Sequence, residues 1–412
     1  MARALVPSSD PRPSPIGPGR RLGSGFGADP FPFYRRWREA SPVLEIAHEG
    51  EPPELLVTGY AEVRELLRDE RVSADRRRAP RLRALLAAAP LRPDLDSMLV
   101  RDDPDHERLR RLVSQAFTRR SVSALEPRIR ALADAHLDAA ARAGRFDAVA
   151  DYAEPVATLV IAELMGIESQ AHERFRGWTQ ALLAGLFGSA RAESDVIRAR
   201  RELDGQWLAL ICARRAAPRD DLVSDLLEAR DAGQQLSDPE LLGMLNLILV
   251  AGHESSANGI ASTLFALLRE SEAHERARSA DDAWWANAVE EALRWQSPIQ
   301  TVARAARTGL EVAGRRVPEG AALTLLLGAA NRDPRVFRAP DRFDPARQNA
   351  KQHLAFGFGD HFCLGAALAR AEMAIAARAV FERFPRARLA EPRPPWRRTV
   401  LLRGLERLPL RI

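Results

Sequence analysis

The sequence has few cysteines and no long apolar run. Its 412 residues include two cysteines, Cys212 and Cys363. Two are too few for the disulfide framework of a small secreted protein, and they suit the reducing cytoplasm. The strongest apolar run, Leu241 to Ala251, is much shorter than the ~20 residues that cross a bilayer. We therefore expect a cytoplasmic protein with no membrane insertion.

Lysine is also nearly absent. Lys351 is the single lysine, so the formal net charge of +5 comes almost wholly from arginine. A basic surface suits an acidic protein partner or a nucleic acid. The sequence contains no Arg-Lys block, no zinc-finger spacing and no repeat of aromatic and basic residues, so we expect no nucleic-acid partner. With 46% hydrophobic and 28% charged residues, the composition is that of a globular protein.

Residues 1–28 are rich in proline, glycine, serine and arginine and lack the apolar core of a signal peptide. We predict a flexible leader there, followed by one domain over 29–412. Alternating apolar residues and turn signals indicate β-rich portions at about 43–58 and 298–325. Between about 125 and 232 the chain has helical periodicity and few strand signals. The expected fold class is mainly α.

One cysteine stands in a distinctive loop, Phe356 to Gly365, with the sequence Phe-Gly-Phe-Gly-Asp-His-Phe-Cys-Leu-Gly. Apolar residues recur at helical spacing from Leu364, which places Cys363 at a helix N-terminus, where the helix dipole favours a thiolate. An arbitrary lone cysteine is usually a small buried hydrophobe. The pattern Phe-Gly-x-Gly-x-His-x-Cys-x-Gly, however, resembles the haem-binding loop of the cytochrome P450 family.

A second signal lies in a helix that begins near Ser237 with a capping-box pattern. Leu241 to Val250 is apolar nearly all round, which is typical of a buried helix. An acid in such a helix, Glu254, is costly unless it has a purpose. A histidine precedes it, but the second histidine of a zinc-protease motif is replaced by Ala257. The segment instead resembles the acid-alcohol pair of P450 enzymes, with Ser255 in place of the usual threonine.

Three further residues match positions that hold the haem propionates in the family. His106 and Arg110 are four apart, so they share a helical face and can bind one anionic group together. The alternative for this stretch is a solvated, arginine-rich helix. Arg304 precedes a Gly-x-x-x-Pro-x-Gly turn at the offset found in the family; otherwise it is one of many arginines. The resemblance implies that these residues, with His361, bind the propionates.

Glu291 and Arg294 are three apart on a predicted helix. On a surface, such a pair contributes only ~0.2–0.5 kcal/mol. The pair nevertheless matches the buried Glu-x-x-Arg of the P450 family, which a later basic residue completes. Here the resemblance assigns that role to Arg342 and predicts that all three support the cysteine loop.

Together, five motifs in the family order imply the mainly α P450 fold with a small β-rich region. The resemblance implies heme b, iron protoporphyrin IX, with Cys363 as its axial thiolate; such a thiolate favours O–O cleavage. The implied reaction inserts one oxygen atom from O2 into a C–H bond or alkene of an apolar terpenoid, steroid or polyketide-like molecule. Electrons would come from a ferredoxin or flavodoxin and its reductase. Glu254 would relay protons, and the Ser255 hydroxyl would donate a hydrogen bond on the oxygen side.

The expected contacts follow from the same comparison. Haem contacts should include Phe356, Gly357, Gly365 and Ala251. Substrate contacts should come from residues 76–99 and 177–189 and from Leu247, Val250, Ala251, Gln300, Val302, Val400 and Leu401. These side chains are mostly aliphatic, which favours an apolar substrate. Basic residues on the cysteine side suit an acidic redox partner, namely Arg110, Arg111, Arg119, Arg120, Lys351 and Arg370.

Three alternatives remain open. A peroxygenase of the same fold would use H2O2, but that type lacks the acid-alcohol pair. A non-catalytic haem sensor or carrier would keep Cys363 without needing Glu254 or Ser255. A cysteine hydrolase would need a histidine base for Cys363, and His361 is the only nearby candidate.

Overall fold

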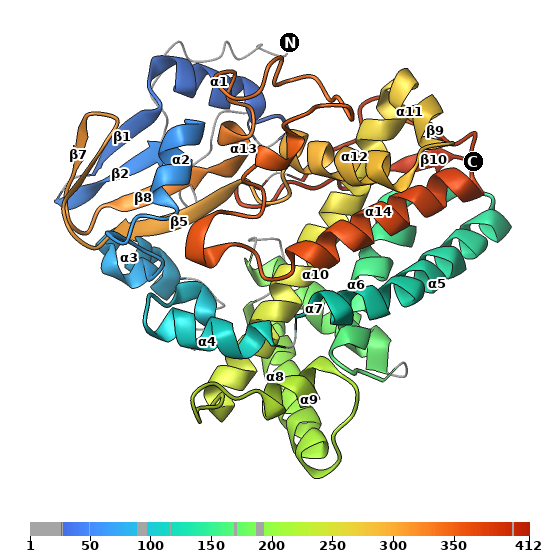
Figure 1. Cartoon of the computed structure of the whole chain (residues 1–412), viewed down its shortest axis with the longest axis horizontal. Helices are drawn as coiled ribbons and strands as arrows, with labels where there is room; N and C mark the ends of the chain where they lie inside the picture. Colours follow the sequence, from blue (N-terminus) through green and yellow to red (C-terminus); the bar gives the residue numbers. More distant parts are fainter. Residues whose placement is uncertain are drawn as a thin grey trace.

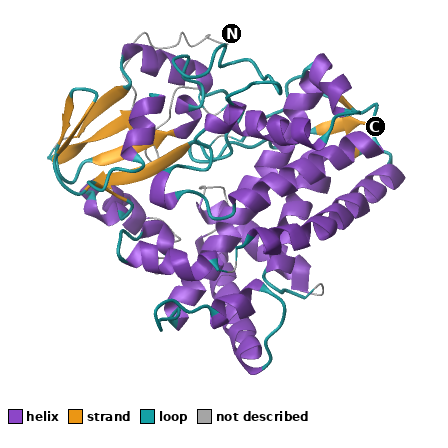
Figure 2. Ribbon diagram, in the orientation of Figure 1, coloured by secondary structure: helices purple, strands orange, loops and turns teal. Residues whose placement is uncertain are grey.

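This computed structural model describes residues 26, 28–48, 50–88, 97–115, 117–168, 171–186, 193–397 and 399–412. Helices make up most of it, and a small group of strands lies at one end (Figures 1 and 2). The predicted mainly α class with a small β-rich region is confirmed. The predicted leader lies outside the described residues, apart from positions 26 and 28.

The main sheet has five strands in the order β1-β2-β8-β5-β3. Their bounds are β1 (Val43–His48), β2 (Glu51–Val57), β8 (Ala322–Leu326), β5 (Thr301–Ala306) and β3 (Val72–Ser73). Neighbouring strands are antiparallel except β2 and β8, which are parallel. A parallel pair needs a long crossover, and here most of the helices lie between β2 and β8 in the chain. The sheet thereby brings residues 54–57 and 322–325 side by side.

Two short helices cover the sheet. In α1 (Phe31–Ala40), the buried aromatic residues Phe31, Tyr34 and Trp37 recur every three positions, so they share the face that packs inward. The other helix is α2 (Tyr60–Leu66). Smaller strand groups lie elsewhere: β6 (Leu310–Val312) pairs with β7 (Arg315–Val317), and β10 (Pro409–Arg411) lies between β4 (Phe146–Asp147) and β9 (Arg388–Leu389).

The long helix α10 (Asp238–Arg269) runs through the middle of the molecule (Figure 1). The predicted capping box is present: the Ser237 N–H donates to the Glu240 carboxylate at 2.9 Å, and the Glu240 N–H donates back to the Ser237 hydroxyl. Most α10 side chains are buried, against α6 (Glu154–Leu164), α12 (Asp282–Trp295) and α14 (Ala366–Arg383). A helix packed on so many sides holds its functional residues in a fixed place.

Residues 76–99 mix arginine, proline, alanine and leucine without a clean helical period, which predicts an irregular segment. The structure contains more regular elements there. The segment forms the 3-10 helix η1 (Arg76–Arg78), then α3 (Pro80–Ala88), and η2 (Met98–Val100) starts at its end. Proline is favoured in the first turn, and the following alanine, leucine and arginine residues are good helix formers despite the missing period. The prediction of an irregular segment was therefore wrong for 76–88, and 89–96 lie outside the described residues.

The predicted helical series between 125 and 232 is present. It comprises α5 (Arg119–Ala143), the π-helix η3 (Ala148–Ala153), α6, α7 (His172–Leu186), α8 (Glu193–Ala216) and α9 (Leu222–Glu228). The remaining helices are α4 (Asp105–Ser114), α11 (Ser271–Ala277), α13 (Leu327–Ala330), η5 (Ala350–Gln352) and η6 (Gly359–His361). The expected pocket segment 177–189 is helical up to Leu186, and 187–189 lie outside the described residues. Among the described helices, none combines the length and apolar character needed to span a membrane.

Candidate active site

The loop before α14 presents Cys363 three residues ahead of the helix, as the sequence predicted. The Cys363 N–H donates to the carbonyl of Phe356 at 2.9 Å and closes the loop. Gly359 has a φ of +73°, and a Cβ there would lie 2.9 Å from the carbonyl oxygen of Leu67. Only glycine combines that dihedral with so close an approach. Gly357 also has a positive φ.

The Cys363 side chain remains accessible although protein surrounds it on most sides. Burial raises the pKa of its thiol, and the backbone N–H of Gly365 and the charges of Arg110 and Arg370 act in the opposite direction. Coordination to a metal deprotonates a thiol outright. The loop therefore provides an accessible sulfur, and a bound metal cation would stabilise its thiolate form.

Three predicted basic residues come together beside this loop. His106 on α4 is buried, and its ring centroid lies 4.0 Å from that of His361. Arg304 on β5 is buried as well, and it donates to the neighbouring carbonyl of Ala303 at 3.0 Å. Burial and then the charge of Arg304 lower the pKa of His361 to about 2, with further contributions from His106 and Arg110. The structure thus gathers the residues predicted to bind the propionates.

Arg76 joins this basic cluster, although the sequence motifs did not single it out. Burial and then the charge of Arg76 lower the pKa of Arg304 to about 10, against the opposing charge of Asp102. Two buried nitrogens of the cluster, Nε of Arg76 and Nε2 of His106, have no hydrogen-bond partner among the described residues. Buried polar and charged groups are costly without partners. The cluster therefore has the properties of an anion-binding site.

One face of α10 stays open in an otherwise buried stretch. Leu247, Val250, Ala251 and Ser255 are all at least partly accessible, whereas most of the neighbouring side chains are buried. Counted from Leu247, the other three residues follow after three, four and eight positions, which places all four on one helical face. The Ser255 hydroxyl donates to the carbonyl of Ala251 at 2.5 Å within the helix. Aliphatic groups and one hydroxyl therefore border the same accessible space.

Glu254 is buried and bound to a residue from the far end of the chain. Arg397 donates from Nη1 to Oε1 of Glu254 at 2.9 Å, and it also pairs with Glu154 on α6. Burial raises the pKa of Glu254, Arg397 opposes that shift, and Glu154 adds to it. No sequence motif pointed to Arg397 or Glu154, because nothing local distinguishes them from the many other charged residues.

The buried pair Glu291 and Arg294 on α12 is present, with nitrogen–oxygen distances of 2.6 and 2.8 Å and no exposed side-chain surface. The assignment of Arg342 as the third member was wrong. Arg342 is exposed, and only its backbone carbonyl accepts from Arg294. Arg347 takes that role instead, donating from Nε to both Glu291 oxygens at 2.9 and 3.1 Å.

A second acid of α12, Glu290, binds residues on either side of the cysteine loop. It accepts from His353 at 2.9 Å and from Nε of Arg370 at 2.6 Å. Although burial acts to raise the pKa of Glu290, these two partners lower it to about 2. The Arg370 guanidinium also lies 4.5 Å from the ring centre of Phe356. Arg370 is therefore engaged in holding the loop, which contradicts its expected use as a free docking residue.

The other predicted pocket residues lie in two adjacent segments. The Gln300 N–H donates to the carbonyl of Leu401 at 2.8 Å. The Gln300 side chain is buried, and its amide nitrogen donates to the carbonyl of Ser297 at 2.6 Å, whereas its amide oxygen has no hydrogen-bond partner among the described residues. Val302 and Val400 are partly buried against hydrophobic clusters, and Leu401 is 40% exposed.

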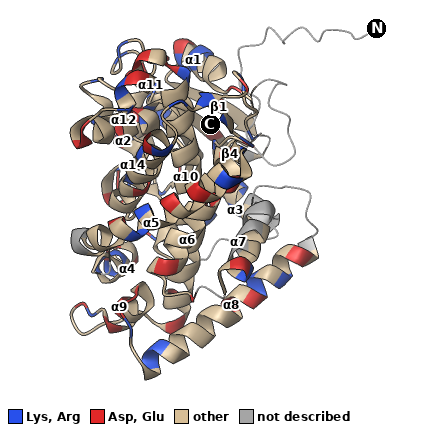
Figure 3. Cartoon of the chain, turned by 90° about the vertical axis from the view of Figure 1, so that its right-hand side faces the viewer, with Lys and Arg blue, Asp and Glu red and all other residues tan. Residues whose placement is uncertain are grey.

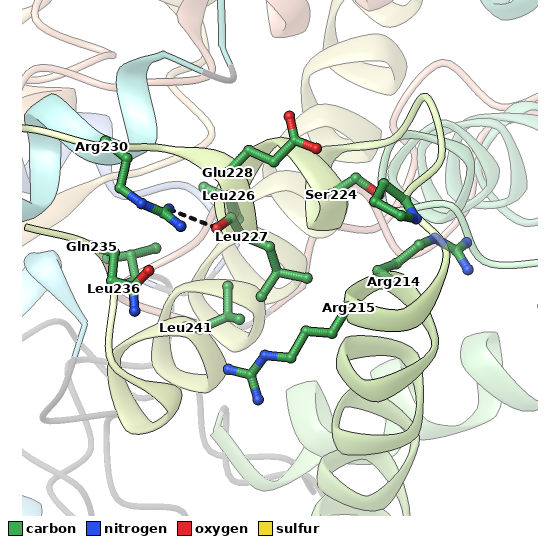
Figure 4. Close-up of a pocket in the computed structure, with 11 residues that line it drawn as sticks. Arg214, Arg215, Ser224, Leu226, Leu227, Glu228, Arg230, Gln235, Leu236 and Leu241 are labelled. Carbon is green, nitrogen blue, oxygen red and sulfur yellow. Dashed lines mark hydrogen bonds between the residues drawn. The ribbon is translucent and has the colours of Figure 1, made fainter.

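A separate hollow lies between α8, α9 and the first turn of α10, where Arg214, Arg215 and Arg230 surround Leu241 (Figure 4). Thirteen helical residues separate Leu241 from Glu254, which corresponds to about 20 Å along the axis. This hollow is therefore distinct from the site around Cys363.

Residues 285–403, which include the Glu291–Arg294 pair and the cysteine loop, match the family model described as Cytochrome P450. The chain is 40% identical to Cytochrome P450 107B1 of Saccharopolyspora erythraea over 94% of its own length and 96% of that protein. The chain belongs to the cytochrome P450 family. It is also 38% identical to the cytochrome P450 monooxygenase PikC of Streptomyces venezuelae, over 95% of this P450 and 92% of that protein.

The fold of this P450 agrees with its sequence relatives. The solved structure of the bacillaene polyketide synthase cytochrome P450 PksS from Bacillus subtilis superposes with a TM-score of 0.86 at 36% identity, covering 94% of this chain and 98% of that one. The predicted P450 fold and the activity class of a cytochrome P450 monooxygenase are therefore confirmed.

The P450 family implies a haem with a cysteine thiolate ligand, and the residues of this chain fit such a group. Cys363 offers an accessible sulfur at the start of a helix. Beside it, the cluster of Arg76, His106, Arg304 and His361 contains buried nitrogens without partners. The carboxylates of haem are anions of the kind that these groups bind.

Proposed function

We propose that this P450 binds heme b through the thiolate of Cys363 and inserts one oxygen atom from O2 into a C–H bond or alkene of an apolar small molecule. The observation that carries this proposal is the accessible Cys363 thiol beside a basic cluster in which Nε of Arg76 and Nε2 of His106 are buried without a hydrogen-bond partner among the described residues. When bound, the haem would supply an iron centre, and the thiolate of Cys363 as its ligand would favour O–O cleavage.

The protein side chains have separate tasks in this proposal. His106, His361, Arg110 and Arg304 bind the haem carboxylates through charge-assisted hydrogen bonds. Phe356, Gly357 and Gly365 shape the loop that presents the sulfur. Glu290, with His353 and Arg370, keeps that loop in position from α12 and α14. The buried Glu291, Arg294 and Arg347 support the backbone segments behind it.

Glu254 and Ser255 manage protons. A carboxyl relays protons best when its pKa lies near the working pH, and burial moves the pKa of Glu254 in that direction. Arg397 positions its Oε1 by a hydrogen bond. Ser255 carries a hydroxyl at the accessible face of α10, where it donates to the carbonyl of Ala251. If that hydrogen bond breaks, the hydroxyl is free to donate to a group in the accessible space.

The proposed substrate class is supported by the accessible face of α10 and by the relatives of the chain. Leu247, Val250 and Ala251 give the accessible face of α10 an aliphatic character. Relatives of the chain include 6-deoxyerythronolide B hydroxylase and vitamin D(3) 25-hydroxylase, at 36% identity each. We infer an apolar polyketide-, steroid- or terpenoid-like substrate. A ferredoxin or flavodoxin with its reductase is the proposed electron source.

Any docking surface for that donor is a limited patch. Arg111 is already paired with Glu107 and Asp231, whereas Lys351 is exposed. Acidic and basic residues are interspersed along α8 in Figure 3 rather than separated by sign. The surroundings of Lys351 and Arg110 are the proposed contact, because the charge of Arg110 acts on the Cys363 thiol and Lys351 is exposed shortly before the cysteine loop.

The ferrous–CO absorption spectrum of the purified protein tests the proposed cofactor. We expect the red-shifted Soret band of thiolate-ligated haem. A spectrum without bound haem, or with the unshifted band of histidine ligation, would rule the proposal out. Turnover of an apolar compound with reduced ferredoxin and O2, compared with turnover in H2O2 alone, then separates the monooxygenase from a peroxygenase. A sensor or carrier would turn over in neither condition.

The pH dependence of turnover tests the role of Glu254. The charged groups that act on it are Arg397 and, on α6, Glu154. Arg397→Gln removes the cation that stabilises the carboxylate, so the pKa of Glu254 rises and its inflection in the pH profile of kcat moves to higher pH.

Glu254→Gln should abolish that inflection, and Arg393→Gln, an exposed arginine of the same segment, should leave it in place. An inflection that is unchanged in Arg397→Gln would show that Glu254 does not titrate in the proton pathway.

A further inference from the structure

Three consecutive arginines form η1 (Arg76–Arg78), and two of them have carboxylate partners. Arg77 donates to Asp75 at 2.7 and 2.8 Å. Nε of Arg78 lies 3.5 Å from the carboxylate of Asp102. Both side chains are almost half exposed, at 43% and 47%. These two arginines are ordinary surface ion pairs, and they take up the acids nearest to the turn.

Arg76 differs from both neighbours. Protein surrounds its side chain, Nε is buried without a partner among the described residues, and burial lowers the pKa of its guanidinium. The 3-10 turn η1 packs against β5, the strand that carries Arg304, and the charge of Arg76 lowers the pKa of Arg304. Asp102 acts on Arg304 in the opposite direction, and its carboxylate lies beside Arg78. Within the described part of the chain, no carboxylate pairs with Arg76.

A buried guanidinium with cations around it and no counter-ion is unfavourable. A carboxylate between these groups would remove the penalty, because the guanidinium fork matches the two oxygens of a carboxylate. The directions of the three side chains of η1 explain why only one of these arginines can bind such a carboxylate. In a tight 3-10 turn successive side chains point about a third of a circle apart, so a single side chain of η1 faces β5 and its Arg304.

We propose that Arg76 binds a carboxylate of the haem together with Arg304 and His361. This inference rests on the proposed haem site and adds a residue that the cysteine, helix and strand motifs did not include. Since η1 leads directly into α3, the contact also links the cofactor to the segment 76–88, which the sequence predicted to contact the substrate. Haem binding and the placement of that segment are then coupled.

The same guanidinium chemistry would suit the carboxylate of an acidic substrate. The cluster favours the haem, because His361 belongs to the cysteine loop and its ring centroid lies 4.0 Å from that of His106. If Arg76 binds the haem, replacing it should weaken haem retention; if it binds a substrate carboxylate, replacing it should weaken only the binding of acidic substrates. One set of variants therefore separates the two.

The test compares holoenzyme variants by the rate at which haem transfers to an excess of apomyoglobin. Arg76→Gln should release haem about tenfold faster than the wild type, since a charge-assisted hydrogen bond is lost. Arg77→Gln is the matched control, one residue away and solvent-exposed, and should stay within about twofold of the wild type. Arg76→Lys should recover part of the retention, because it keeps the charge and loses the planar fork.

The reduction potential of the haem provides a second readout. Removing a cation beside the cofactor disfavours the reduced form, so the potential of Arg76→Gln should shift to a more negative value, with no matching shift in Arg77→Gln. Equal haem release and equal potential in the two variants would overturn the proposal.

A third readout is the spin-state change of the haem on titration with myristate or with its methyl ester. If Arg76→Gln weakens the binding of myristate but not that of the ester, while haem release and potential stay normal, Arg76 binds a substrate carboxylate and the proposal is overturned. A wild-type protein that retains haem with a thiolate spectrum in these experiments leaves the proposed function standing; a protein that binds no haem overturns both.

Discussion

Replacing Cys363 with histidine abolishes oxygenation while haem remains bound. The expected fall in product formation is on the order of 100-fold or more. Replacing a residue that only hydrogen-bonds to a metal ligand typically lowers activity by ~10–100-fold, and replacing the ligand itself should cost more. Histidine is a neutral ligand and does not supply the electron density of a thiolate. The basic cluster of His106, Arg304 and His361 is unchanged by the substitution, which is why the haem should be retained.

The measurement combines the ferrous–CO spectrum with product formation under saturating O2. The Soret band of Cys363→His should lose its red shift. Cys212→Ala is the matched control, because Cys212 is the other free cysteine, lies on α8 and is also exposed. It should leave both spectrum and turnover unchanged. Oxygenation that persists in Cys363→His would contradict the ligand assignment.

Replacing Arg294 with methionine should lower the free energy of unfolding by ~3–5 kcal/mol. Arg294 has no exposed surface, and it donates to the Glu291 carboxylate and to the carbonyls of Asn331 and Pro340. Methionine fills part of the volume but removes the Arg294 donors from the carbonyls of Asn331 and Pro340, and it leaves Arg347 as the one guanidinium partner of Glu291. Breaking one side of a buried ion pair is costly for that reason.

Urea unfolding of the holoenzyme, followed by circular dichroism, measures this loss as a lower midpoint. The control is Arg378→Met on α14, whose partners Asp282 and Glu382 are exposed and whose own side chain is 39% exposed. Surface ion pairs of this kind contribute ~0–1 kcal/mol, so this variant should unfold near the wild-type midpoint. A loss below about 1 kcal/mol in Arg294→Met would mean that Arg347 alone satisfies Glu291.

Several features could be predicted from sequence because their signals are local. The capping box at Ser237 and Glu240 uses residues three apart. The spacing of His106 and Arg110 and that of Glu291 and Arg294 follow from the helical period alone. The cysteine loop combines glycine, histidine and cysteine within ten residues, and its glycines answer a backbone requirement that the structure confirms at positive φ.

Pairings between distant segments were not predictable in this way. Arg397 and Glu254 are separated by 143 residues, and nothing in either stretch marks the other as its partner. The choice between Arg342 and Arg347 depends on how the segment after α13 folds back on α12, since both arginines lie within reach in sequence. Arg370 reads as a surface cation, yet Glu290 and Phe356 draw it against the cysteine loop.

The sequence by itself therefore determined the family and the fold class and predicted Cys363 as the ligand, since short motifs with strict spacing encode them. The tertiary structure alone decided which arginines are buried and what they face. Arginine is abundant in this chain, and each one carries the same charge and the same donors. Its role follows from whether packing removes it from water and which carboxylate it then meets, as the inward-facing Arg76 and the solvent-facing Arg77 of one short turn illustrate.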